Sequence, residues 1–220
     1  MSELIETILR FFGKLLLLRS QQLREGDPRQ PVMQPATLPA SSKTPPKMDP
    51  DALRTLLTDE VRNPKYVPVA DDPNTTESER KTFCNLFTRA ACRKFGWNGF
   101  ETPDRDQAGE MARFMRNNPQ HWQKLEGPWK HLDKSGTGPD YEKATELASR
   151  GHLVIASQEE PNPPPTGHVC IVAPEKPMIH SPKWGRPVSI AANVGASNWY
   201  GKTLAYAFKN EPELFLYLGS

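Results

Sequence analysis

Cys84 is the first candidate for chemistry in this chain, because of its place in the sequence. Apolar residues recur at three- and four-residue steps from Lys81 to Phe95, which predicts a helix. Cys84 falls in the first turn, where unpaired backbone N–H groups and the helix dipole lower the pKa of a thiol. A cysteine in this position is suited to attack a carbonyl carbon as the thiolate.

His168 is the matching candidate for a base. It follows the turn-forming stretch Pro163–Gly167 and opens the apolar run His-Val-Cys-Ile-Val, which is typical of a strand. An imidazole can accept and return a proton near neutral pH. Taken singly, Cys84 also fits a small core residue and His168 a hydrogen-bonded strand histidine. Together they favour nucleophilic catalysis.

The elements that position these two residues change in type along the chain. Helices are predicted first and strands afterwards, which is typical of an α+β fold with an antiparallel sheet. The further helices are 51–61, 107–117 and 140–150, and the strands are 152–157, 168–173, 187–194 and 214–218.

Four segments together resemble one family of enzymes. They are Thr82-Phe-Cys-Asn-Leu-Phe, Gly151-His-Leu-Val-Ile-Ala, Gly167-His-Val-Cys-Ile-Val and Ser189-Ile-Ala-Ala-Asn-Val. This pattern, over residues 82–219, is similar to the NlpC-type and CHAP (cysteine, histidine-dependent amidohydrolase/peptidase) branch of papain-like enzymes, mostly bacterial and phage peptidoglycan hydrolases. The resemblance implies a papain-like core, Cys84 as nucleophile, His168 as base and a polar orienting residue on the next strand.

Asn193 is the candidate for that orienting residue, and His180 is its rival. A neutral amide can fix the imidazole tautomer by bonding its far nitrogen. Members of the CHAP group often have a glutamate in this neighbourhood, where this chain has Ala191 and Ala192. Backbone N–H groups at the helix start would hold the oxyanion, with Asn85 or Tyr66 as candidate side-chain donors.

Several other residues have competing interpretations. Zinc binding by Cys84, Cys170, His152 and His168 lacks a short ligand pair such as Cys-x-x-Cys, so we expect neither a metal nor an organic cofactor. Cys92, on the polar side of its helix, and Cys170 are predicted to be structural. The last set fits either core packing or a substrate groove: Met111, Met115, His121, Trp122 and Trp129.

The N-terminal part is predicted to be separate from the catalytic domain. Residues 1–24 have the pattern of an amphipathic helix, which would either dock on a membrane surface or a delivery or immunity protein, or pack on its own domain. Residues 25–50 form a proline-rich linker, and residues 51–220 form the hydrolase domain. A net charge of +2 argues against a nucleic-acid partner.

The expected function is cleavage of an amide bond in a peptidoglycan stem peptide or cross-link. The alternatives are an acyltransferase or amidase with another substrate and a non-enzymatic docking protein. The N-terminus lacks the basic region and cleavage site of a secretory signal. We therefore expect synthesis in the cytoplasm and action in the periplasm or cell wall after delivery, as a phage-type lysin or a secreted antibacterial effector.

Overall fold

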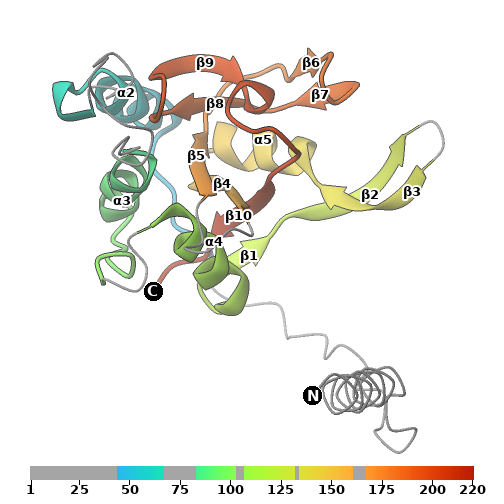
Figure 1. Ribbon diagram of the computed structural model, residues 1–220. Coiled ribbons are helices and arrows are strands. Elements are labelled where there is room, and N and C mark those ends of the chain that lie inside the picture. Colours follow the sequence, from blue (N-terminus) through green and yellow to red (C-terminus); the bar gives the residue numbers. More distant parts are fainter. Residues whose placement is uncertain (1–43, 67–82, 103–106, 132–133, 161–166) are drawn as a thin grey trace, which may run out of the picture. The chain divides into compact units, whose positions relative to one another are not determined.

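The computed structural model describes residues 44–66, 83–102, 107–131, 134–160 and 167–220 (Figure 1). The chain divides into two units, residues 1–40 and 41–220. The predicted N-terminal helix and residues 25–43 of the predicted linker lie outside the described residues. All the described residues therefore belong to the second unit.

A six-stranded sheet is the centre of this unit, and all its neighbouring strands run antiparallel. Together with the helices that pack on it, this sheet confirms the predicted α+β class. The strands, in their order across the sheet, are β1 (Trp122–Lys124), β10 (Glu213–Tyr217), β4 (Val154–Glu159), β5 (Gly167–Val172), β8 (Ile190–Asn193) and β9 (Trp199–Thr203).

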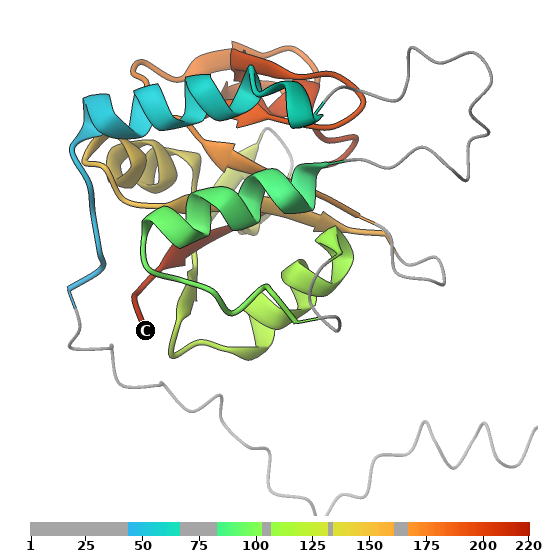
Figure 2. The same ribbon diagram turned by 90° about the vertical axis from the view of Figure 1, so that its left-hand side faces the viewer.

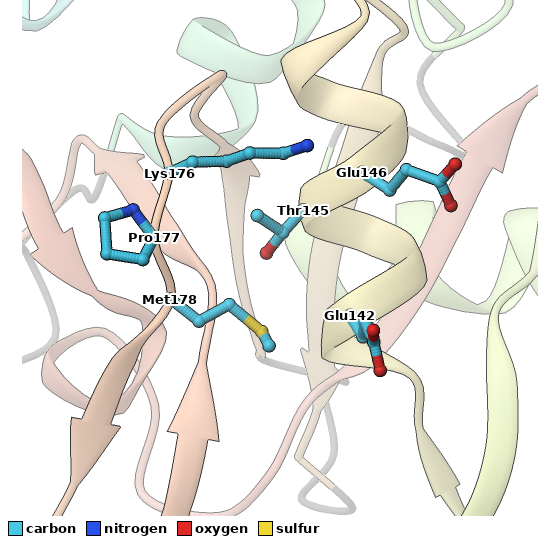
Figure 3. A pocket seen from close by; sticks show the side chains of 6 residues that line it. All are labelled: Glu142, Thr145, Glu146, Lys176, Pro177 and Met178. Atoms are coloured by element: carbon cyan, nitrogen blue, oxygen red, sulfur yellow. The ribbon is translucent and has the colours of Figure 1, made fainter.

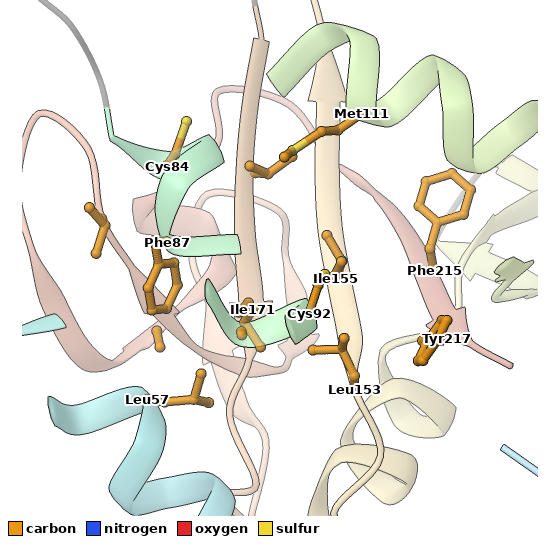
Figure 4. Close-up of a cluster of buried hydrophobic side chains, with 14 of the residues drawn as sticks. Leu57, Cys84, Phe87, Cys92, Met111, Leu153, Ile155, Ile171, Phe215 and Tyr217 are labelled. Carbon is orange, nitrogen blue, oxygen red and sulfur yellow. The ribbon is translucent and has the colours of Figure 1, made fainter. Parts of the chain in front are cut away.

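Helices cover both faces of the sheet (Figures 1 and 2). Successive strand residues face opposite sides, so Ile155 and Ile171 belong to one apolar cluster and Val154 and Cys170 to another. The first cluster, part of which Figure 4 shows, lies beneath three helices, and the second beneath one. The three are α2 (Pro50–Val61), α3 (Cys84–Lys94) and α4 (Ala108–Asn117), and the one is α5 (Tyr141–Ser149).

The helices form where their caps and apolar spacing predict them. Asp49 caps α2 by accepting the backbone N–H groups of Asp51 and Ala52 at 2.9 and 3.1 Å, and Pro50 occupies the first helical position. Asp140 caps α5 in the same way. No helix among the described residues combines the length and the hydropathy needed to cross a membrane.

Two hairpins were missed because their strands are short or rich in Gly, Pro and charge. They are β2 (Glu126–His131) with β3 (Lys134–Pro139), and β6 (Ile179–Ser181) with β7 (Arg186–Val188). The predicted strand 187–194 is in fact two, β7 and β8, separated by Ser189. Its hydroxyl donates to the carbonyl of Tyr141 at 3.1 Å and also bonds the hydroxyl of Thr145 at 2.8 Å, which ties the break to α5.

Residues 46–50, at the end of the predicted linker, lie on the domain. Met48 donates its backbone N–H to the carbonyl of Gly151 at 3.0 Å, and His152 bonds the carbonyl of Pro46 at 3.1 Å through Nδ1. Gly151 has a φ of +87°, and a Cβ there would stand 1.7 Å from the Met48 carbonyl oxygen. Only glycine permits this close approach of the incoming chain.

Candidate active site

Cys84 is the first residue of α3, three residues after the predicted start of that helix. Phe83 precedes it at the N-cap, and phenylalanine has no side-chain acceptor to cap a helix. The Cys84 thiol is not in a disulfide, and the residue is 1 % exposed. Figure 4 shows Cys84 at the start of α3, with Phe87 and Cys92 further along the same helix. The thiol therefore lies where a helix start stabilises negative charge.

His168 lies near the start of β5, on the strand beside β4, where it pairs with Gln158. Its imidazole contacts the ring of Phe208, with 5.1 Å between the ring centroids and 58° between the planes. Phe208 is itself buried. One side of the imidazole is thus held by an aromatic ring while the residue stays partly exposed.

Asn193 is the last residue of β8, and its side-chain oxygen lies 2.6 Å from Nε2 of His168. Its amide nitrogen donates to the backbone carbonyl of Ser197 at 2.7 Å, which fixes which end of the amide faces the imidazole. Because an amide oxygen only accepts, Nε2 must carry the proton. The neutral imidazole then has its lone pair on Nδ1.

The Cys84 thiol hydrogen-bonds the His168 imidazole. Since Nε2 bonds Asn193, Nδ1 is the nitrogen that is left for the sulfur. Burial alone lowers the pKa of His168, but the hydrogen bond and the charge of Cys84 raise it, as do the bond from Asn193 and the charge of Glu160, and the net pKa is raised. The surroundings of His168 therefore favour its protonated form.

The rival third residue and the candidate oxyanion donors have other surroundings. His180 is exposed on β6, in a two-stranded sheet apart from β5, whereas Asn193 makes the bond to His168. Tyr66 ends a short 3-10 helix (Pro64–Tyr66), and its hydroxyl donates to the Glu60 carboxylate at 3.0 Å. Asn85 is partly exposed beside Cys84.

The other two cysteines, Cys92 and Cys170, are also buried and are not in disulfides. Burial raises the pKa of Cys92 and of Cys170. The expectation that Cys92 lies on the polar side of α3 is wrong, because it packs in the cluster beneath the helix. Within the described segments, no group of three or more His, Cys, Asp or Glu side chains is placed to hold a metal ion.

The groove interpretation is wrong for Met111, Met115 and Trp122, which are at most 1 % exposed. Trp122 stacks on Phe100 with 5.5 Å between ring centroids, inside an aromatic cluster below α4. His121 bonds the carbonyl of Gly219 at 2.9 Å through Nδ1. The side chain of Trp129 lies outside the described part of the chain.

A shallow cavity of about 250 Å³ lies next to α5, on the opposite face of the sheet from α3 (Figure 3). Thr145 and Met178 line it between the charged side chains of Glu142 and Lys176. It belongs to the face of α5, whereas Cys84 packs in the cluster beneath α2, α3 and α4. It is therefore separate from the candidate active site.

Three residues that contact or support the site were missed by sequence reasoning: Gly195, Asn198 and Phe208. Gly195 and Asn198 lie in the connection from β8 to β9, whose Gly, Ser and Asn residues indicate only a turn. Phe208 follows the 3-10 helix Leu204–Tyr206, far from His168 in the sequence. Only the fold brings it to the imidazole.

No family model matches this chain, and no curated protein matches it significantly.

Proposed function

We propose that this chain is a papain-like cysteine hydrolase in which Cys84 is the nucleophile, His168 the general base and acid, and Asn193 the residue that orients the imidazole. The observation that carries this proposal is the hydrogen-bonded series from Cys84 through His168 to Asn193. A buried thiol, an imidazole with a fixed tautomer and an amide on the adjacent strand are the three parts that such a mechanism needs.

The first half of the proposed reaction forms an acyl-enzyme. The Cys84 thiolate attacks the carbonyl carbon of an amide, and the negative charge that moves to the carbonyl oxygen is held by backbone N–H groups at the start of α3. The His168 imidazolium then gives its Nδ1 proton to the leaving nitrogen as the carbon–nitrogen bond breaks. An amine leaves, and the acyl group remains on sulfur.

The second half returns the enzyme to its first state. Nδ1 of His168 takes a proton from water, which attacks the thioester and releases a carboxylic acid. Asn193 keeps the Nε2 proton pointed away from the sulfur throughout, because its own amide is fixed by the bond to Ser197. No metal ion or organic cofactor is needed for these steps.

Peptidoglycan is the substrate that we propose. The support is the similarity of the segments around Cys84 and His168 to NlpC-type and CHAP hydrolases, together with the matching order of nucleophile, base and orienter along the chain. The bond would be an amide of a stem peptide or cross-link, and the enzyme would act in the cell wall.

Digestion of purified sacculi tests this proposal. The full chain should release soluble fragments with new amino and carboxyl groups, detected by mass spectrometry, and Cys84→Ala and His168→Ala should abolish their release. His180→Ala is the matched control, because this exposed histidine lies outside the site and its loss should leave the rate unchanged.

The outcomes separate the alternatives. If the wild-type chain releases no fragments but Cys84 still reacts rapidly with an electrophilic inhibitor, the site would be assigned to another amide substrate or to acyl transfer. Unchanged release by Cys84→Ala would refute the proposed nucleophile.

A further inference from the structure

The connection between β8 and β9 is held by three side-chain hydrogen bonds. The Asn193 amide nitrogen donates to the carbonyl of Ser197 at 2.7 Å, and the backbone N–H of Gly195 donates to the side-chain oxygen of Asn198 at 3.1 Å. The amide nitrogen of Asn198 donates to the carbonyl of Tyr66 at 2.6 Å. Asn198 thus uses both ends of its amide to join two backbone segments that are far apart in the sequence.

One end of this connection lies against the catalytic imidazole. A Cβ on Gly195 would stand 3.2 Å from Cε1 of His168, so the glycine backbone forms a close wall beside the ring. The backbone N–H of this same glycine donates a hydrogen bond to the side-chain oxygen of Asn198. The position of this glycine wall, and hence the space available to the His168 imidazole, depends on the hydrogen bond between Gly195 and Asn198.

The other end leads to the helix that carries Cys84. Tyr66 is 1 % exposed and packs edge-on against Phe87, with 6.4 Å between ring centroids. Phe87 lies in the first turn of α3 and donates its backbone N–H to the carbonyl of Phe83 at 2.9 Å. Tyr66 is therefore packed against the turn that begins with Cys84.

We infer that Asn198 is a positioning residue that sets the distance between Cys84 and His168, by tying the Gly195 wall to the Tyr66 segment packed on α3. This inference rests on the proposed function. An asparagine suits the position because it provides one acceptor and one donor at opposite sides of one planar group. An aspartate has the same shape but only accepts hydrogen bonds. Its negative carboxylate oxygen would therefore face the partly negative carbonyl oxygen of Tyr66.

The test compares Asn198→Asp with Asn118→Asp in the full chain. Asn118 is a suitable control, because its amide also donates to a backbone carbonyl, that of Phe114 at 2.8 Å, at the end of α4. Two quantities are measured: the NMR titration of the His168 ring and the amide turnover. Both are read at a temperature where thermal melting shows each variant to be folded.

We expect Asn198→Asp, and not Asn118→Asp, to move the His168 titration midpoint and to slow turnover. We expect turnover to fall by about tenfold. A misplacement of the reacting groups by 1 Å can lower turnover by about a hundredfold, and a smaller displacement is expected here. A wild-type His168 midpoint and wild-type turnover in folded Asn198→Asp would overturn the inference. So would equal effects of the two variants, which would indicate a general loss of stability.

If Asn198→Asp does not fold, Gly195→Ala tests the inference in its place. The new methyl would press on Cε1 of His168 without removing any bond of Asn198, so the His168 midpoint should move while the fold is kept. An unchanged midpoint would refute the wall. If the wild-type chain cleaves no amide, the proposed function fails, but the His168 midpoint in Gly195→Ala, which adds no charge, still reports whether Gly195 positions the imidazole.

Discussion

Alkylation of the three cysteines at acid pH isolates the effect of the Cys84–His168 pair. The perturbation is His168→Gln, which keeps a polar side chain but removes the group that can carry a proton next to the thiol. Iodoacetamide modifies only thiolates, and peptide mass spectrometry follows Cys84, Cys92 and Cys170 separately. We expect Cys84 to react faster in the wild-type chain than in the variant.

The size of the difference can be worked from the hydrogen bond between the thiol and the imidazole. A hydrogen bond to a charged group contributes about 1.5 to 3 kcal/mol. At 1.36 kcal/mol for each tenfold change in ionisation, this moves the thiolate equilibrium by about 10- to 100-fold. A more stable thiolate is a weaker nucleophile, which takes back about the square root of that gain. The wild-type rate should therefore exceed that of His168→Gln by about three- to tenfold at pH 5.

The pH of the assay matters because an ordinary thiol is still a weak competitor there. With a pKa of about 8.5, only about one thiol in three thousand is ionised at pH 5. At pH 9 most exposed thiols are ionised, so the stabilising effect of His168 would no longer appear. The ratio of the two rates should therefore fall as the pH rises, to one or below, because the stabilised thiolate is the weaker nucleophile.

Cys92 and Cys170 are the internal controls for unfolding. All three cysteines are buried, but burial raises the pKa of Cys92 and Cys170, and no histidine acts on the pKa of either. They should stay unmodified in both proteins while Cys84 reacts. Equal Cys84 rates at pH 5 in the wild type and in His168→Gln would refute the ion-pair argument, and modification of Cys92 as fast as Cys84 would mean that the chain is not folded in the assay.

Four further predictions concern the site and the core. Asn193→Ala should lower the pKa of His168, since it removes a bond that raises that pKa, so NMR should show the protonated form lost at lower pH than in the wild type, with turnover reduced but measurable. Phe87→Ala should cost about 3 to 5 kcal/mol in the free energy of unfolding, measured with urea, because Phe87 is fully buried beneath α3. Gly151→Ala should lower the melting temperature far more than Gly96→Ala, since both have positive φ but only Gly151 has a backbone oxygen within 2 Å of the added Cβ. Deletion of residues 1–40 should leave the melting temperature of the domain within a few degrees, and a large fall would mean that these residues stabilise it.

The same His168 shift has a consequence for folding stability. A histidine whose pKa is raised in the folded state stabilises the fold below the ordinary value of about 6.5, where it is protonated in both states but better held in the folded one. This contribution disappears as the pH rises through the raised pKa. It therefore opposes acid unfolding and is absent in alkaline solution.

The periodicity of the sequence determined the main elements and the two central site residues. The four predicted helices of the domain agree with α2 to α5 to within about three residues, because each has a regular apolar face and Asp49, Asp140 and Gly96 mark three of their ends. The strands that carry His168 and Asn193 were predicted because they are continuous apolar runs between turns. Local spacing suffices where the signal lies within one element.

Tertiary structure alone decided which residues meet. Cys92 is buried although its helical position suggested a polar face, because α2 and the sheet surround α3 on more than one side. Tyr66 hydrogen-bonds with Glu60 and Asn198. Phe208 contacts the His168 imidazole from a segment forty residues further along the chain. These contacts depend on strand order and on the path of the loops, and neither leaves a periodic trace in the sequence. The sequence identified Cys84, His168 and Asn193 as the candidate residues, and packing between distant segments determined how they are held together.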